Sequence, residues 1–440
     1  MTPDQGRLAP AEQRSLLYGP IYRIIGTPVT AALGLANTAI VVRETGSAVF
    51  GLVSLVATIA LLVPFADLGI GATVLSASAQ LSGPHRNPDA VDVIRRGYRV
   101  LFAVAGTIAL VSLTVMATDG WDTVVGFSSG PQDRWAITVA ACTFALTVPA
   151  GLGVRILIGI GRNPLATLVL MSCPLFGLVI TLLLYAVNAD GIWYATSPLA
   201  GLLVGQLIGT ALALRLSGLG RSVYARVPGS RPGPRLLAGS GWLFVVGVGL
   251  PAGLHTGRVI LGHLGTPAEL SDYALMAQLY AVCWSVLSTA ALAYWPVFVK
   301  RRTATEETVR LWWGVTGAFA GMAGLAGVCM VLSGPWLARI VSGGELDVSV
   351  WLALAFAAVL LGQAIHLPTF VLLTRPVEAR WQALWTLAMA VLSIGLGCVF
   401  APIFGAVGVA SAAAFGIFVA QVVPDLIWVP RLVRRRSRRS

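Results

Sequence analysis

The sequence predicts an all-helical membrane protein of twelve transmembrane helices, arranged as two six-helix lobes around a central cavity. Hydrophobic residues make up 57% of the 440 residues, whereas charged residues make up 11%, less than half the share of about 25% in soluble domains. The apolar residues also form blocks of about 20, the length that crosses a hydrocarbon core. Finally, the two halves of the chain share features that indicate an internal repeat.

The apolar blocks define the predicted elements in order. The first six spans cover 18–41, 50–66, 98–118, 135–158, 164–187 and 192–214. The second six cover 236–261, 273–297, 311–332, 350–373, 383–400 and 405–429. The predicted organisation is an N-terminal segment 1–17, an N-lobe 18–214, a basic linker 215–235, a C-lobe 236–429 and a basic tail 430–440.

The repeat is seen where the first two spans of each half meet. VVRETGSAVFG joins spans one and two, and LGHLGTPAELSDYA joins spans seven and eight. Each junction contains glycine and leads into an aromatic residue followed by a small one, Phe50-Gly51 and Tyr273-Ala274. Two such halves in one chain are typical of transporters with two lobes around a cavity, although channels also contain repeats.

The distribution of basic residues predicts the orientation in the membrane. With both ends in the cytoplasm, cytoplasmic segments hold 24 of the 30 Lys and Arg residues, and outer loops hold only Arg43, Arg134 and Arg339. This bias is the one that the positive-inside rule describes. Lys300 is the only lysine, and the Ala- and Gly-rich composition indicates a GC-rich bacterial genome. We therefore expect a multi-pass protein of the bacterial cytoplasmic membrane, with both termini cytoplasmic.

The same composition excludes several classes of function. No glycine-rich loop precedes Lys300, so the chain has no Walker A motif for ATP. The five cysteines form no CxxC pair and the four histidines no zinc motif. We expect no cofactor or metal, apart from Na⁺ or H⁺ as a coupling ion. The arginines of the tail are expected to contact anionic membrane lipids, and nucleic acid is not an expected partner.

Three stretches resemble a known family. VFGLVSLVATIALLVPFADLGIGATV, with its aromatic-Gly start and later DLG, resembles the second helix of polysaccharide-unit flippases of the Wzx type. GRVILGHLGTPAELSDYALMAQL resembles their seventh and eighth helices, and YWPVF before Lys300 resembles the end of the eighth. The chain is thus similar to the multidrug/oligosaccharidyl-lipid/polysaccharide (MOP) exporter superfamily, which includes the MATE drug exporters.

The resemblance implies two lobes whose cavity opens alternately to each side of the membrane. Wzx-type proteins move a polyprenyl-pyrophosphate-linked oligosaccharide from the inner to the outer leaflet, for cell-surface polysaccharides such as O-antigen. It therefore implies a flippase that is not an enzyme, with a lipid-linked glycan as cargo. Glycan polymerases or glycosyltransferases of the same pathway are the implied protein partners.

Three arginines lie inside predicted spans, where ionisable groups are costly and often functional: Arg23, Arg155 and Arg258. Arginine offers a planar, permanently charged fork to phosphate oxygens. Arg23, Arg155 and Asp67 are predicted near the cytoplasmic side, as a charge cluster that closes an inner gate, or else as residues that reach the headgroups. Arg258 lies near the outer end of its span, to receive the headgroup or anchor the helix. Asp425 is expected to pair with the basic tail.

Neutral polar groups inside the spans are candidates for binding sugar hydroxyls, and the alternative for each is a hydrogen bond between helices. An aromatic face could also stack on a sugar ring. The candidates are Asn37, Gln206, His255, Gln278, Trp284, Gln363 and His366.

Two other functions remain open at this stage. An ion-coupled exporter of cationic drugs would need carboxylates in its cavity, but the first predicted span contains an arginine and no acid. A membrane glycosyltransferase or polymerase would need catalytic carboxylates on large outer loops. The outer loops are short, and Asp119, Asp122 and Asp133 are the candidates in one of the longest.

Overall fold

The computed structural model describes residues 10–58, 70–82, 88–126, 130–189, 191–220, 241–292, 294, 297–298, 305–373 and 376–436, which contain helices and turns and no strand. The helices of the first half are α1 Pro10–Ala57, α3 Ile70–Ala79, α4 Pro88–Ala117, α5 Trp121–Val125, α6 Pro131–Ala150, α7 Leu152–Gly159, α8 Asn163–Ala186 and α9 Thr196–Leu216. Short 3₁₀ segments η2 (Gln80–Ser82) and η3 (Gly191–Ala195) lie between them. The second half contains α11 Gly241–Leu264, α12 Pro267–Leu292, α14 Thr305–Ser342, α15 Val350–Leu372, α16 Pro376–Ile417, the π-helical segment η5 Phe418–Val422 and α17 Val423–Arg436.

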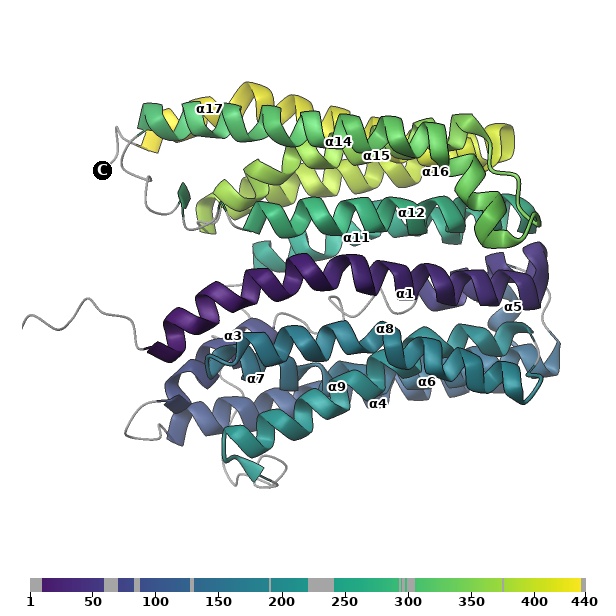
Figure 1. Ribbon diagram of the computed structural model, residues 1–440, viewed down its shortest axis with the longest axis horizontal. Helices are drawn as coiled ribbons and strands as arrows, with labels where there is room; N and C mark the ends of the chain where they lie inside the picture. The colour runs from purple at the N-terminus through teal and green to yellow at the C-terminus, as the bar shows by residue number, and fades with distance from the viewer. Residues whose placement is uncertain are drawn as a thin grey trace, which may run out of the picture.

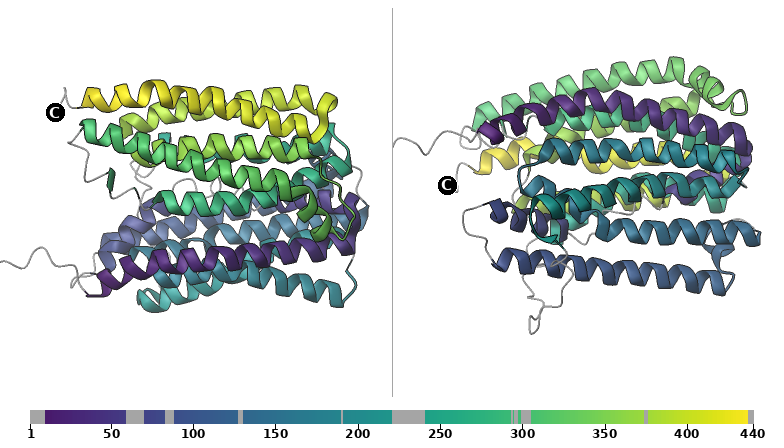
Figure 2. Two further views of the ribbon diagram at one scale, coloured as in Figure 1. Left: turned by 45° about the horizontal axis from the view of Figure 1, so that its top comes forward. Right: turned by 60° about the horizontal axis from the view of Figure 1, so that its bottom comes forward.

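The helices form two bundles that lie side by side, with their axes roughly parallel (Figures 1 and 2). One bundle contains α1 and α3 to α9, and the other contains α11 to α17. Helix α1 lies at the boundary, because it packs against α8 in its own bundle and against α12 in the other. The two-lobed, all-helical fold that the sequence predicts is confirmed.

Two helices are too long to be single spans. Helix α1 has 48 residues and α16 has 42, or about 72 and 63 Å at 1.5 Å per residue, against a hydrocarbon core of about 30 Å. Each contains one non-helical glycine, Gly46 (φ 75°, ψ 167°) and Gly405 (φ 54°, ψ −136°). Glycine adopts a positive φ at little cost. These two glycines therefore divide the long helices at the predicted junctions between spans one and two and between spans eleven and twelve.

The surface confirms a multi-pass membrane protein. Nine helical segments within the described residues are long and apolar enough to cross a membrane, and two of these contain the glycines just described. Large apolar side chains face outward, and Leu110, Leu183 and Leu325 are between 60% and 69% exposed. Predicted spans two, seven and eight extend into residues outside the described part, so the full count of twelve stays a prediction.

Local signals in the sequence explain where several helices begin. At the start of α12, the backbone N–H of Thr266 donates to the Glu269 carboxylate at 2.8 Å, and the N–H of Glu269 donates to Thr266 Oγ1 at 3.3 Å. This reciprocal pair is a capping box. At the start of α15, Ser349 Oγ accepts a hydrogen bond from the backbone N–H of Leu352 at 3.2 Å. Such bonds satisfy N–H groups that have no partner within the helix.

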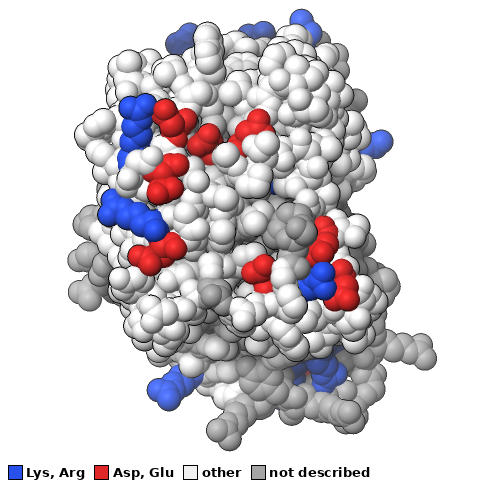
Figure 3. Space-filling view, turned by 90° about the vertical axis from the view of Figure 1, so that its right-hand side faces the viewer, with Lys and Arg blue, Asp and Glu red and all other residues white. Residues whose placement is uncertain are grey.

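Helix α1 begins and α17 ends at the same end of the bundle, which we call the terminal end (Figure 1). The opposite loop end carries clusters of acidic side chains with few basic ones (Figure 3). The three arginines predicted in outer loops contact loop-end groups. Arg134 pairs with Asp119, Arg339 pairs with Asp347 at 2.8 Å, and Arg43 donates to the Ile340 carbonyl at 2.9 Å.

Candidate functional site

A central cavity of about 470 Å³ lies between the two lobes. Helices α1, α8 and α9 contribute one side of its wall, and α11, α12, α15 and α16 contribute the other. Most of the lining is aliphatic or aromatic, with a few polar groups. A mainly apolar pocket of this size, with convergent polar groups, is the usual form of a ligand site.

Two basic side chains enter this cavity from α11. His255 and Arg258 are three residues apart, so they share a face of the helix, and both line the cavity. The Nη1 of Arg258 donates to Thr58 Oγ1 at 3.0 Å, and that hydroxyl donates to the Ser54 carbonyl at 2.8 Å. Arg258 therefore joins the C-lobe to the N-lobe, while only one of its five N–H donors is used in this bond.

Two carboxamides line the cavity from helices of different lobes. The Asn37 side chain on α1 accepts a hydrogen bond from Thr181 Oγ1 on α8 at 2.5 Å. Gln278 lies on α12, opposite Gly34 of α1, and a Cβ on that glycine would stand 3.1 Å from Gln278 Nε2. The glycine therefore allows α1 and α12 to approach closely and leaves room for the Gln278 amide in the cavity.

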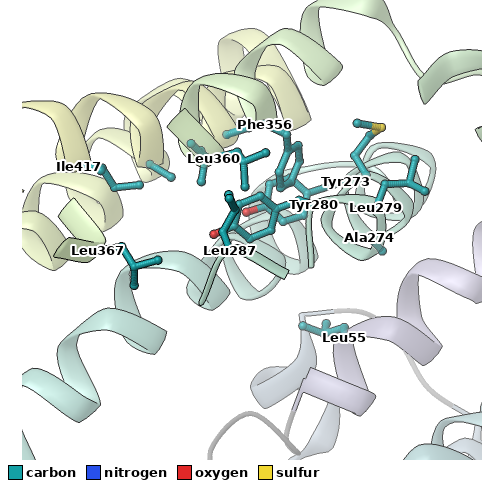
Figure 4. Packing of buried hydrophobic residues seen from close by; sticks show 14 of the residues in the cluster. Leu55, Tyr273, Ala274, Leu279, Tyr280, Leu287, Phe356, Leu360, Leu367 and Ile417 are labelled. Carbon is teal, nitrogen blue, oxygen red and sulfur yellow. The ribbon is translucent and has the colours of Figure 1, made fainter. Parts of the chain in front are cut away.

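Aromatic rings form the C-lobe side of the wall (Figure 4). Phe356 of α15 packs against Tyr273 and Tyr280 of α12, with ring centroids 5.0 and 6.0 Å apart. One turn beyond Tyr280, the Trp284 ring lies nearly parallel to it, at an interplanar angle of 6° and a centroid distance of 6.5 Å. All four rings line the cavity. The wall thus offers flat apolar faces beside the basic pair.

The lining has an unbalanced charge. Among its described residues there are one arginine and one histidine, and no aspartate or glutamate. Charges interact more strongly in such an apolar space than in water. The cavity therefore favours a ligand with negative charge.

A second cavity of about 220 Å³ lies within the C-lobe. Gln363 and His366 of α15 line it, and Trp284 lines both this cavity and the central one. His366 Nδ1 is 2.7 Å from Asp425 Oδ2. The prediction that Asp425 pairs with the basic tail is therefore wrong. A buried carboxylate found a partner inside the lobe, whereas Arg434 of the tail pairs with Glu306 at 3.0 Å.

The structure thus brings Asn37, His255, Arg258, Gln278 and Trp284 together in the central cavity. Gln363 and His366 belong to the second cavity.

The remaining candidates lie elsewhere. Gln206 is buried on α9, and Arg155 is exposed on α7; neither lines the two cavities. Arg23 lies in α1, but its side chain is outside the described part, as is the whole of Asp67. The gate formed by Asp67 with Arg23 or Arg155 stays a prediction.

Sequence reasoning missed Thr58, which holds Arg258 across the lobe boundary. A threonine in an apolar span carries no distinguishing pattern, because its hydroxyl is usually satisfied by a carbonyl of its own helix. The pairing of His366 with Asp425 did have a signal: each is an ionisable group in an apolar span, and such groups usually find a partner within the membrane.

Comparisons with known proteins agree with this architecture. The pattern of the family described as "Polysaccharide biosynthesis protein" matches residues 16–301. An inward-facing multidrug resistance MATE family transporter of the MOP superfamily superposes with a TM-score of 0.69 at 14% identity, covering 96% of this chain and 99% of its own. A MOP superfamily transporter from Pyrococcus furiosus, for which reverse polarity of the binding pocket suggests a different function, gives a TM-score of 0.63 at 14% identity, covering 97% of this chain and 96% of its own. No curated protein matches the chain.

Proposed function

Because the chain belongs to the polysaccharide biosynthesis protein family and has the fold of MOP superfamily transporters, we propose that it is a flippase for a polyprenyl-pyrophosphate-linked oligosaccharide. The family and the fold together support a membrane exporter of the MOP superfamily. The central cavity supports the proposed cargo. The proposed direction is from the inner to the outer leaflet of a bacterial cytoplasmic membrane, with the loop end outside.

The observation that carries this proposal is a basic cavity without an acidic residue among its described lining. A guanidinium binds phosphate oxygens through paired, charge-assisted hydrogen bonds. Arg258 is therefore the group that would bind the pyrophosphate, with His255 beside it as a further donor.

The rest of the lining suits the glycan. Asn37 and Gln278 offer amide groups to sugar hydroxyls, and the rings of Tyr280 and Trp284 offer flat faces on which a sugar can lie. A cavity of about 470 Å³ accommodates a ligand of small-molecule size. It would hold the pyrophosphate and the first sugars, while the polyprenyl chain stays in the lipid beside the lobes.

The contact between Arg258 and Thr58 gives this cargo a way to move the lobes. Arg258 donates a hydrogen bond across the lobe boundary to Thr58. A pyrophosphate that binds the other N–H groups of the guanidinium would draw it away from the Thr58 hydroxyl, because a charged acceptor forms stronger hydrogen bonds than a neutral one. Cargo binding would weaken this link between the lobes and favour the change from one opening to the other.

Two alternatives are less well supported. A pump for cationic drugs needs negative charge at its site, whereas the described lining of this cavity has only basic charge. A glycosyltransferase or polymerase needs free carboxylates at the loop end. Asp119 and Asp122 are both paired with Arg134, and Asp133 accepts a hydrogen bond from the Gly130 backbone. These acids stabilise the loop in which they lie.

Depletion of the protein in its host tests the proposal. The lipid-linked saccharides are extracted and compared by mass spectrometry before and after depletion. We expect one polyprenyl-pyrophosphate oligosaccharide to accumulate and the matching surface glycan to be lost. Unchanged lipid-linked saccharides, together with new sensitivity to cationic dyes, would instead establish the drug exporter.

A further inference from the structure

The C-lobe contains an ionisable pair that the proposed cargo site does not use. His366 lies on α15 and Asp425 on α17, and Nδ1 and Oδ2 are 2.7 Å apart. The two residues are 5% and 1% exposed, respectively. Ionisable groups at such depth in a membrane protein are costly and are usually kept for a function.

The charge of this pair depends on one proton. A neutral imidazole that donates its Nδ1–H to the carboxylate leaves the pair with one negative charge, buried in the lobe. A proton that adds to the lone pair of His366 Nε2 converts the pair into an imidazolium and a carboxylate, which together have no net charge. An uncompensated buried charge is strongly unfavourable. The charged and the neutral form of the pair are therefore stable in different surroundings.

The geometry also defines how a proton reaches the pair. His366 lines the second cavity, whereas Asp425 lies behind it and lines neither cavity. Trp284 contributes to the walls of both cavities. Of the two residues, His366 is therefore the one that a proton in the second cavity can reach.

Amide groups near the pair have polar atoms that are free to form further hydrogen bonds. Gln363 and Gln421 are each 1% exposed, and Gln363 Nε2 and both polar atoms of Gln421 have no hydrogen-bond partner among the described residues. Gln421 lies in the π-helical segment η5, one turn before Asp425. Segments of this kind occur often at functional sites. The orphan amides can supply hydrogen bonds that a change in the charge of the pair requires.

The pair is also connected to neighbouring helices. Thr369, one turn beyond His366, accepts a hydrogen bond from Trp312 Nε1 of α14 at 3.2 Å. Its carbonyl accepts one from Gln382 Nε2 of α16 at 3.3 Å. A movement of α15 against α17 would therefore strain or shift these hydrogen bonds to α14 and α16.

Other titratable groups lie on the helices packed around the pair. On α14 and α17, Glu306 and Arg434 pair with each other at 3.0 Å, and on α16 the guanidinium of Arg380 lies 5.7 Å from the centroid of the Trp242 ring. Among the side chains that the structure describes, the other such groups on these helices and on α12 and η5 are Glu269, Asp272, Tyr273, Tyr280, Cys283, Glu307, Arg310, Cys329, Arg339, Glu378, Cys398 and Arg431.

We propose that His366 and Asp425 form a proton-binding site, which takes up and releases one proton through the second cavity and couples a pH gradient to the movement of the lobes. Uptake adds the proton to His366 Nε2. Release removes the same proton from Nε2 and restores the negative charge of the pair. The inference rests on the chain being a transporter, and not on the identity of its cargo. Proton binding is accordingly tested without cargo.

The first test uses the full-length protein in lipid nanodiscs with isotope-labelled histidine. The chain has four histidines, so His366→Gln identifies the His366 signal in the NMR spectrum. We expect this signal to move with pH, and Asp425→Asn to change the pH range over which it moves. A signal that stays constant, or one that is indifferent to Asp425→Asn, would overturn the proposal.

The second test measures coupling in vesicles that contain a polyprenyl-pyrophosphate oligosaccharide. We expect an imposed pH gradient to increase its translocation by the wild-type protein, and His366→Gln and Asp425→Asn to abolish this increase while translocation without a gradient persists. His263→Gln is the matched control, because His263 lines neither cavity. If translocation by the wild-type protein does not change with the gradient, the proton site is contradicted but the flippase function is not. No translocation by the wild type, with the NMR response present, contradicts the flippase instead.

Discussion

At the scale of single residues, Arg258 connects the central cavity to the lobe boundary. Its guanidinium lines the central cavity and bonds to Thr58 of the other lobe. Sequence reasoning could identify it, because a charged residue inside an apolar span is a functional candidate. The same reasoning could not show that His255 and Gln278 share its cavity while Gln206 does not, since that depends on how the helices pack.

Substitution of Arg258 tests its role directly. We expect Arg258→Ala to reduce translocation of the lipid-linked oligosaccharide at least about tenfold, because a lost charge-assisted hydrogen bond costs roughly 1.5–3 kcal/mol. Arg258→Lys should recover part of the activity, since it keeps the charge but not the planar fork. The measurement is surface glycan in a depleted host, normalised to the amount of protein in the membrane. Arg215→Ala, at an exposed arginine of α9, is the control, and an equal loss there would show that the effect is not specific to the cavity.

At the scale of helices, the positions of the breaks follow from the sequence. The predicted junctions around Gly46 and Gly405 agree with the structure, since both glycines have a positive φ within an otherwise continuous helix. The order of the apolar blocks was therefore enough to predict these two breaks. It was not enough to predict the π-helical segment η5, because one extra residue in a turn does not visibly change the pattern of apolar residues.

The glycine break in α1 gives a prediction about stability. We expect Gly46→Ala to lower the stability of the protein by about 1–3 kcal/mol, because this backbone conformation is almost confined to glycine. A Cβ there would meet no atom within 4 Å, so the effect is one of backbone strain alone. The measurement is the thermal unfolding of the full-length protein in detergent.

The control for this prediction is Gly314→Ala. Gly314 lies inside α14, and a Cβ there also has open space. Alanine is favoured over glycine in a regular helix, so this change should leave the unfolding temperature equal or slightly raised. Equal effects of the two substitutions would contradict the assignment of Gly46 as the point where the helix breaks.

At the scale of the whole molecule, the charges divide between the two ends. The described loop end carries acidic clusters (Figure 3). Arg43, Arg134 and Arg339 contact groups at this end, whereas α17 ends in a run of arginines. Composition and charge bias predicted this division without knowledge of the packing. The cavities and their lining could not be predicted in the same way, because both arise where the two lobes, or helices distant in sequence, meet.

Impermeant thiol labelling of intact cells tests the orientation. We expect a maleimide added outside to label Glu345→Cys, at the loop end, and to label Glu307→Cys, at the terminal end, only after permeabilisation. Both glutamates are exposed, so the two variants differ in their side of the membrane and not in burial. The unsubstituted protein, with its five native cysteines, gives the background. The reverse pattern would place the termini outside.

The proposed activity is the movement of a pyrophosphate-linked glycan across the membrane through the basic cavity. Its most direct test is the purified protein in liposomes that contain a polyprenyl-pyrophosphate oligosaccharide with a radiolabelled sugar. A glycan-cleaving enzyme outside the liposomes reports how much of the label reaches the outer leaflet. We predict that the wild-type protein brings nearly all of the label within reach of the enzyme, and that Arg258→Ala leaves it at the level of protein-free liposomes. Equal protection of the label with and without the wild-type protein would rule out the flippase activity.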